Sequence, residues 1–270
     1  MRGLSPFAMK YVLTIAGSDS SGGAGIQADI KTITSLGAHA LTAITALTAQ
    51  NSLGVAAIKS VPARFISNQI ETVVQDIFPN AVKIGMLFTG AAIRRVARDI
   101  KKYGLPWVVL DPVFRASTGK ALLEPTAVTC LREVLLPLTN VVTPNLEEAG
   151  ILTGKRVRTL SDMKKACTVI KEMGPSVVIT GGHLKGDCVD LLYTGEEFHS
   201  FYGERIKTDH THGTGCVFSS ALATFLAMDC GLERAVSEAH HFTRHAIAKG
   251  YPCGRGPGVV RPLMREKARR

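Results

Sequence analysis

Short apolar segments alternate with helical stripes along most of this 270-residue chain, and this alternation is the strongest constraint on its fold. Stripes at helical spacing, such as Ile66, Ile70 and Val73, separate the apolar segments. Strands that alternate with helices pair in parallel through right-handed crossovers. We therefore predict an α/β three-layer sandwich with a mostly parallel central sheet and an antiparallel extension at its edge. The strands predicted for the parallel part cover residues 11–16, 41–47, 82–84, 108–110, 141–143 and 177–180, and the extension covers 187–193 and 198–201.

The composition favours one domain with a large core, because 46% of the residues are hydrophobic and 20% are charged. No linker, repeat or low-complexity segment divides the chain. We expect an N-terminal extension over residues 1–10, a single domain over 11–260 and a basic tail over 261–270.

Several classes of partner are disfavoured. Apolar runs end before the roughly 18 residues of a membrane span, and residues 1–10 lack the apolar core of a signal peptide. The six cysteines form no C-x-x-C pair, which is typical of free thiols in a reducing compartment. We predict a cytoplasmic protein with no membrane partner.

The net charge of +10 includes the basic tail, and no basic block is interleaved with aromatic residues. A nucleotide substrate therefore explains the charge better than nucleic-acid binding.

The turn at residues 212–216 opens a helix predicted for 217–228. The first amides of a helix have no partner within it, and they lie at the positive end of the helix dipole. The amides of Gly213, Thr214, Gly215 and Cys216 are therefore predicted to form an anion hole for phosphoryl oxygens. The same field favours a thiolate, so Cys216 is a candidate base or nucleophile.

The glycine-rich segment 17–25 follows the first predicted strand. It does not fit G-x-G-x-x-G, and the chain contains no G-x-x-x-x-G-K-[ST] motif. A flexible connection would explain the glycines alone. However, Asp29 lies on the apolar stripe of the next helix, where a carboxylate needs a polar partner. We expect Asp29 to recognise a ligand; an internal salt bridge is the alternative.

Other polar residues follow predicted strands, and in open α/β sheets such residues meet at one edge, where ligands bind. Asp111 is expected to hold magnesium or orient phosphates, with helix capping as the alternative. Asn145 and Glu148 begin a helix, which suits either the surroundings of a magnesium ion or plain capping. His241 and His245 have i, i+4 spacing but no third ligand, so a surface or packed pair is favoured over a metal site.

Several motifs together resemble the hydroxymethylpyrimidine/phosphomethylpyrimidine kinases of thiamin biosynthesis. They occur in family order at residues 15–19, 21–29, 44–47, 49–51, 83–87, 110–113, 143–149, 181–184 and 211–216. The resemblance implies the ribokinase-like fold and ATP-dependent phosphorylation of 4-amino-5-hydroxymethyl-2-methylpyrimidine and then of its monophosphate. It also implies Mg2+ as a cofactor and a homodimer.

The resemblance further implies roles for individual residues. It gives Cys216 the position of the catalytic base and places the anion hole at Gly213, Thr214 and Gly215. Contacts to the pyrimidine carry over to Gly17, Asp29, Gln50, Met86 and Val113. Contacts to ATP and its metal are expected from Asp111, Asn145, Thr180 and Lys185, with Asp111 and Glu148 as metal ligands.

The sequence departs from the family pattern at three places. Ser20 replaces a usual proline, and the lid at 114–118 differs from the usual sequence. Thr180 stands where many members have a lysine, and Lys185 is the residue we expect to compensate. A pyridoxal kinase on the same scaffold is the nearest alternative, although Ala116 and Ser117 replace the lid cysteine of such enzymes. A non-catalytic pyrimidine sensor is a further alternative, and the missing fingerprint disfavours a Rossmann dehydrogenase.

Overall fold

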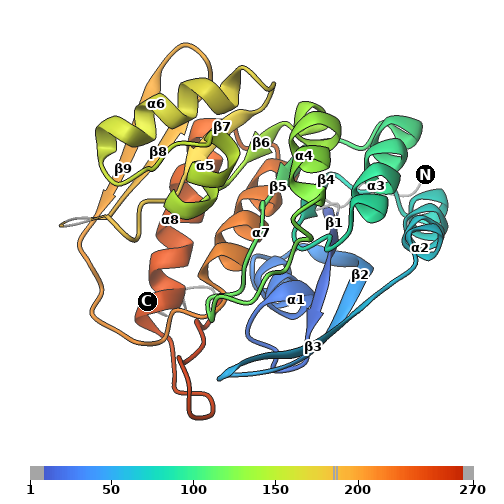
Figure 1. The fold of residues 1–270 in the computed structure, drawn as a ribbon, viewed down its shortest axis with the longest axis horizontal. Coiled ribbons are helices and arrows are strands. Elements are labelled where there is room, and N and C mark those ends of the chain that lie inside the picture. Colours follow the sequence, from blue (N-terminus) through green and yellow to red (C-terminus); the bar gives the residue numbers. More distant parts are fainter. Residues whose placement is uncertain (1–8, 185, 187, 264–270) are drawn as a thin grey trace, which may run out of the picture.

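A computed structural model describes residues 9–184, 186 and 188–263, which form one nine-stranded sheet with helices on both faces (Figure 1). The strand order is β3-β2-β1-β4-β5-β6-β7-β8-β9. The six strands from β2 to β7 in this order pair in parallel, whereas β3, β8 and β9 pair antiparallel. The predicted sandwich and its antiparallel extension are confirmed. The strands are β1 (Tyr11–Asp19), β2 (His39–Asn51), β3 (Gly54–Ser60), β4 (Ala81–Ile84), β5 (Val108–Leu110), β6 (Val141–Val142), β7 (Ser176–Ile179), β8 (Cys188–Tyr193) and β9 (Phe198–Gly203).

Two apolar cores fix the helices to the sheet. Because side chains alternate along a strand, Leu13 and Ile15 of β1 face one core and Val12 faces the other. The first core holds the helices α2 to α6, and the second holds α1, α7 and α8. The helices are α1 (Gly25–Ser35), α2 (Ala63–Asp76), α3 (Gly90–Tyr103), α4 (Ala127–Cys130), the π-helix η1 (Leu131–Leu135), the 3-10 helix η2 (Leu136–Leu138), α5 (Leu146–Thr153), α6 (Leu160–Lys171), α7 (Thr214–Ala227) and α8 (Leu232–Ala248).

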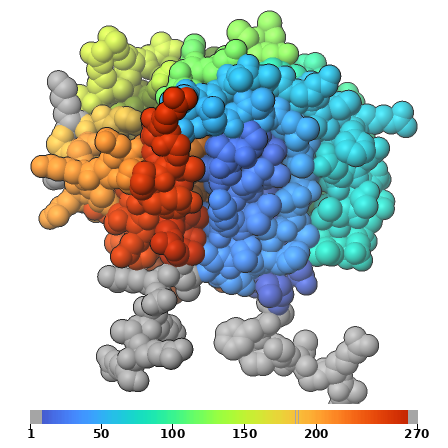
Figure 2. Space-filling model, turned by 90° about the horizontal axis from the view of Figure 1, so that it is seen from below, coloured from blue at the N-terminus to red at the C-terminus, as the bar shows by residue number. Residues whose placement is uncertain are grey.

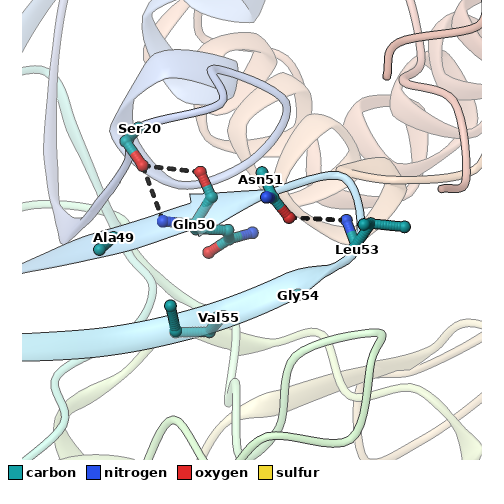
Figure 3. Close-up of a pocket in the computed structure, with 8 residues that line it drawn as sticks. Ser20, Ala49, Gln50, Asn51, Leu53, Gly54 and Val55 are labelled. Carbon is teal, nitrogen blue, oxygen red and sulfur yellow. Dashed lines mark hydrogen bonds between the residues drawn. The ribbon is translucent and has the colours of Figure 1, made fainter. Parts of the chain in front are cut away.

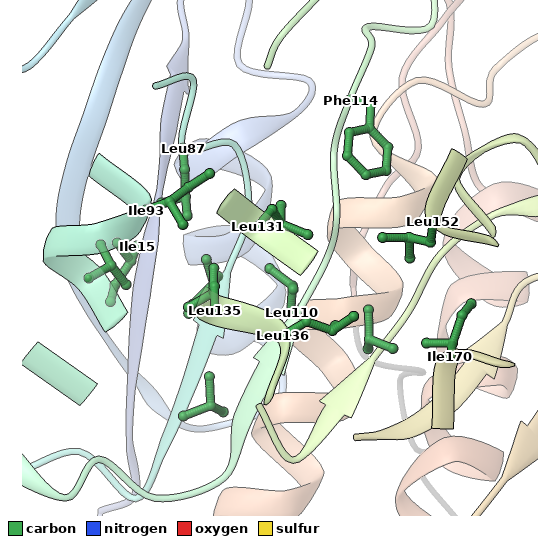
Figure 4. Close-up of a cluster of buried hydrophobic side chains, with 14 of the residues drawn as sticks. Ile15, Leu87, Ile93, Leu110, Phe114, Leu131, Leu135, Leu136, Leu152 and Ile170 are labelled. Carbon is green, nitrogen blue, oxygen red and sulfur yellow. The ribbon is translucent and has the colours of Figure 1, made fainter. Parts of the chain in front are cut away.

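The first core is the larger and joins distant parts of the chain (Figure 4). Ile15 of β1, Ile93 of α3, Leu110 of β5 and Leu135 of η1 are all fully buried. Burying an aliphatic side chain of this size contributes roughly 1.5–3 kcal/mol. This rigid base holds the loops at the carboxyl ends of the parallel strands.

The hairpin formed by β2 and β3 was not predicted. β2 continues to Asn51, so Gln50 and Asn51 belong to a strand rather than to a polar turn. Leu47 and Leu53 are about half exposed in this hairpin and no residue of β3 is fully buried, so β3 lacks the buried face that makes a strand easy to recognise.

The C-terminal segment of the described chain lies against this hairpin. Figure 2 shows the red C-terminal segment lying against the blue N-terminal part. The backbone N–H groups of Arg255 and Gly256 each donate to Ser52 Oγ at 3.1 Å. Most of the predicted extension and tail, residues 1–8 and 264–270, lies outside the described residues. None of the helices in the described part is both long and apolar enough to cross a membrane.

Candidate active site

The loops that follow β1 and β5 converge on the first turn of α7. His212 Nε2 lies 3.1 Å from Asp19 Oδ2 at the end of β1. A Cβ atom on Gly213 would clash with the carbonyl oxygen of Gly23, and one on Gly215 would lie 3.9 Å from Asp111 Oδ2. The expected convergence of these loops is therefore confirmed.

The turn presents free amides, but one fewer than predicted. Gly213 has φ of 88°, a conformation that favours glycine, and α7 begins at the next residue. The amide of Thr214 donates to Thr211 O at 3.2 Å, so it is not available to a ligand as expected. The amides of Gly213, Gly215 and Cys216 take part in none of the hydrogen bonds formed among the described residues. Three of the four amides predicted to form the anion hole are therefore free, and that of Thr214 is not.

Cys216 lies in the first turn of α7 and is partly accessible. Burial raises the pKa of its thiol to about 12, although the charge of Lys83 acts in the opposite direction. Asp29 and Asp111 raise this pKa further. Burial therefore outweighs the favourable charge of Lys83, and the thiol form of Cys216 is favoured in the protein alone.

A buried ion cluster lies beneath this turn. Lys83 of β4 is fully buried, and its Nζ lies 2.9 and 3.0 Å from the two carboxylate oxygens of Asp29. It also lies 3.9 Å from Asp111 Oδ2. Asp29 accepts further hydrogen bonds from Thr14 Oγ1 at 2.6 Å and Ser220 Oγ at 2.7 Å.

These contacts correct the role expected of Asp29. Its exposed fraction is 0%, so it has no surface with which to contact a pyrimidine. The internal salt bridge, which the sequence left as the alternative, is what the structure shows. Lys83 is the functional candidate that sequence reasoning missed. Its signal was a lone lysine in an apolar strand, which requires a buried anion such as Asp29.

Asp111 and Glu148 are buried carboxylates. Burial raises the pKa of Asp111, with Lys83 acting against this rise and Asp29 adding to it. Burial, together with repulsion from Asp111, raises the pKa of Glu148 well above its usual range. A divalent cation would relieve both penalties, and oxygen donors suit Mg2+. The described residues contain no group of three or more histidine, cysteine or acidic side chains that could hold a metal ion.

Asn145 and Glu148 also form a capping box at the start of α5. The amide of Glu148 donates to Asn145 Oδ1 at 3.0 Å, and the amide of Asn145 donates to Glu148 Oε2 at 2.9 Å. The helix capping that the sequence left as the alternative is therefore present. It holds in place the Glu148 carboxylate, whose pKa is raised by burial and by repulsion from Asp111.

Three residues expected to contact the pyrimidine lie together. A Cβ atom on Gly17 would lie 2.8 Å from Met86 Sδ, so a larger residue here would displace the Met86 side chain. Met86 and Val113 belong to the same small apolar cluster, which also includes Ala46 and Leu122. This cluster offers an apolar wall suited to an aromatic ring.

Gln50 lies near the end of β2, beside Ser20 of the first loop (Figure 3). Ser20 Oγ donates to Gln50 O and accepts from Gln50 N, both at 2.8 Å, so the residue in place of the usual proline binds the first loop to β2. An open hollow of about 560 Å3 lies over the β2–β3 hairpin and includes Gln50 in its lining. A smaller hollow is lined by Gln50, Asn51, Ser52, Ser117, Thr118, His212 and Pro257, which brings the lid beside the α7 turn.

The candidate nucleotide loop follows β7. The amide of Thr180 donates to Pro144 O at 3.0 Å, which places Thr180 beside Asn145. Lys185 lies outside the described residues, so its compensating role stays a prediction. Arg205, which sequence reasoning did not consider, donates to Gly182 O at 2.8 Å and brings a positive charge to this loop.

The family model for phosphomethylpyrimidine kinase matches residues 19–261. The chain belongs to this family.

Individual relatives agree with this membership. The hydroxymethylpyrimidine/phosphomethylpyrimidine kinase of Streptomyces coelicolor is 44% identical, with 94% of this chain and 95% of the relative aligned. The thiamine biosynthesis bifunctional protein ThiED of Geobacter sulfurreducens is also 44% identical over 96% of this chain, which spans 54% of the length of that relative. The ADP complex of Bacillus subtilis pyridoxal kinase superposes with a TM-score of 0.88 at 38% identity, covering 94% of this chain and 98% of that one. The predicted ribokinase-like fold is confirmed.

Proposed function

We propose that this protein transfers the γ-phosphoryl group of ATP to 4-amino-5-hydroxymethyl-2-methylpyrimidine and then to its monophosphate, in thiamin biosynthesis. The observation that carries the proposal is the α7 turn. Its free amides at Gly213, Gly215 and Cys216 adjoin the acidic residue Asp111. Family membership and a structural neighbour that is an ADP complex support ATP as the donor.

The turn acts by binding charge. In-line transfer requires the acceptor hydroxyl, the phosphoryl group and the leaving group to lie in a row. The free amides of the turn bind the oxygens of the transferring group, and removing one such donor typically lowers the rate about 100- to 1,000-fold. The apolar wall of Gly17, Met86 and Val113 positions the pyrimidine, with Gln50 at the rim.

In this proposal Cys216 takes the proton of the acceptor hydroxyl after losing its own thiol proton to solvent. The free protein holds Cys216 as a thiol, because its pKa is about 12. Phosphoryl transfer passes through a loose transition state that needs little help from a base. Positioning therefore contributes more to the rate than proton abstraction does.

Asp111 and Glu148 would hold the magnesium ion, which supplies positive charge to the phosphates when bound. Thr180 and Asn145 line the nucleotide side, with Lys185 as a further contact. Replacing Lys185 with alanine tests that contact. An unchanged KM for ATP would show that Lys185 does not contact the nucleotide.

The experiment is a coupled assay of ATP consumption with three acceptors: the pyrimidine, its monophosphate and pyridoxal. We expect turnover with both pyrimidines and a fall of about 100-fold or more in Cys216→Ala. Turnover with none of the three would overturn the proposal and favour a sensor. The Cys230→Ala variant is the matched control, since Cys230 is also a free, partly accessible thiol.

A pyridoxal kinase is the second candidate, favoured by the likeness to the Bacillus subtilis enzyme. The lid here carries Ala116 and Ser117, which we take to favour the pyrimidine. A higher kcat/KM for pyridoxal in the same assay would decide for the alternative.

We further propose that two copies of the chain associate through the β2–β3 hairpin in the cytoplasm. Leu47 and Leu53 expose 50% and 54% of their surface on this hairpin, and covering them favours association. Light scattering should report a dimer, and Leu47→Glu should shift the protein toward the monomer. A monomeric mass for the unmodified protein would contradict this part.

A further inference from the structure

Helix α8 reaches the candidate nucleotide loop through one carboxylate. His240 of α8 is only 3% exposed, and its Nδ1 lies 2.7 Å from Asp190 Oδ2 on β8. The other oxygen, Asp190 Oδ1, accepts from the backbone N–H of Gly181 at 3.0 Å. Gly181 directly follows Thr180, so three elements meet at Asp190.

The His240 imidazole is explained by its hydrogen bond rather than by packing. Nδ1 donates to Asp190, which leaves Nε2 buried, and Nε2 has no hydrogen-bond partner within the described part of the chain. An unpaired buried nitrogen costs free energy that an apolar side chain would not. Packing alone therefore does not explain a histidine here, and the short bond to Asp190 does.

The hydrogen bond between His240 and Asp190 acts on the backbone at Gly181. A Cβ atom at Gly181 would clash with the carbonyl oxygen of Val189, so β8 lies directly against the backbone there. Gly181 and Gly182 have no side chains of their own to hold the loop. The bond from the Gly181 amide to Asp190 therefore fixes the backbone at the first of the two glycines, between the bonds that hold Thr180 and Gly182.

We propose that His240 is a positioning residue for the nucleotide: it orients Asp190, which fixes the amide of Gly181 and hence the 180–182 loop. This inference rests on the proposed function in one respect, namely that the 180–182 loop binds ATP. His240 itself touches no substrate, and it acts entirely through Asp190.

The test compares His240→Leu, which removes the donor, with His240→Asn, whose side-chain amide can replace Nδ1. The matched control is His241→Leu, at an exposed position on the same helix. ADP binding is measured by calorimetry, KM is measured for ATP and for the pyrimidine, and exchange of the Gly181 amide is followed by NMR. Loss of one such charge-assisted bond should weaken ADP binding and raise the KM for ATP about tenfold.

We expect His240→Leu to show this change with faster Gly181 exchange and an unchanged KM for the pyrimidine. His240→Asn and His241→Leu should resemble the unmodified protein. Unchanged ADP affinity in His240→Leu would overturn the inference, and so would an equal rise of both KM values. If His240→Leu does not fold, Asp190→Asn is judged by the same criteria.

The two proposals fail in different ways. Unmodified protein that binds ADP but phosphorylates none of the three acceptors would remove the proposed acceptor and leave the role of His240 open to the calorimetric test. Unmodified protein that does not bind ADP would overturn both.

Discussion

Two acid–base pairs flank the first turn of α7, and they differ in depth. Lys83 and Asp29 have fully buried side chains, and hydroxyl groups of Thr14 and Ser220 complete the pair. At the rim, the side chains of His212 and Asp19 are 13% and 4% exposed. The deep pair joins β4, α1 and α7, whereas the rim pair fastens the first glycine loop to the turn.

The deep pair makes the region around the turn rigid, whereas the rim pair leaves it accessible to ligands. A buried charge without its partner is strongly destabilising, so the deep pair is a matter of stability. A pair close to solvent is worth less, and its effect falls on the geometry of the loops it joins. Variants of the two pairs should therefore separate stability from activity.

The largest effect is expected for Lys83→Met. This variant leaves Asp29 and Asp111 buried without their cation, which should lower the free energy of unfolding by about 3–5 kcal/mol. Urea denaturation measures the change. Adding Asp29→Asn to Lys83→Met should recover part of the loss, and a single variant as stable as the unmodified protein would contradict this account of the deep pair.

The rim pair should be visible in acid. Burial alone would raise the pKa of Asp19, but hydrogen bonds from His212, Ser21 and Ala24 outweigh it and lower the pKa from 3.8 to about 2. A carboxyl whose pKa falls on folding stabilises the protein above its unfolded pKa, here by roughly 2 kcal/mol at neutral pH. This contribution should disappear as the pH falls from about 4 to 2.

Thermal melts of the unmodified protein and Asp19→Asn across this range measure that contribution. The difference in stability between the two proteins should shrink toward pH 2. A constant difference would show that the charge of Asp19 is not what the rim pair uses.

A smaller effect on stability, together with a clear effect on rate, is expected for His212→Leu. Asp19 keeps its bonds from Ser21, Gly23 and Ala24, so the loss should be about 1 kcal/mol. The turn loses its link to the first loop, so kcat should fall about tenfold or more. Steady-state kinetics beside a urea titration separates the two quantities, and unchanged kcat would mean that the link does not position the turn.

The smallest effect is expected for a surface pair used as a reference. Lys10 Nζ lies 2.6 Å from Asp229 Oδ2, but the side chain of Asp229 is 81% exposed. Asp229→Asn should change the free energy of unfolding by less than about 1 kcal/mol and leave kcat unaltered. A larger loss would remove depth as the explanation for the difference between the pairs.

The sequence predicted what depends on local pattern. The parallel strands, the helix that carries Cys216 and the glycine turn before it were all readable, because apolar spacing and helix-end chemistry act over a few residues. The cap that Asn145 and Glu148 form was also readable, since the spacing of the two residues is that of a capping box.

Contacts between distant residues were not readable in this way. Lys83 and Asp29 are 54 residues apart, and each alone is only a charge in an apolar pattern. The bond of the Thr214 amide to Thr211 depends on how the turn closes, which no spacing rule gives. No residue of β3 is fully buried, so the strand that pairs with β2 at this edge was missed.

The turn before α7 is also bound to the end of the described chain. The backbone N–H of His212 donates to Gly258 O, and its carbonyl accepts from the N–H of Val260. During synthesis on the ribosome, these partners emerge almost 50 residues after His212 (258 − 212 = 46). The turn before α7 is therefore completed only after residues 258–260 have been made, so a nascent chain cannot acquire a finished turn ahead of the scaffold that precedes it.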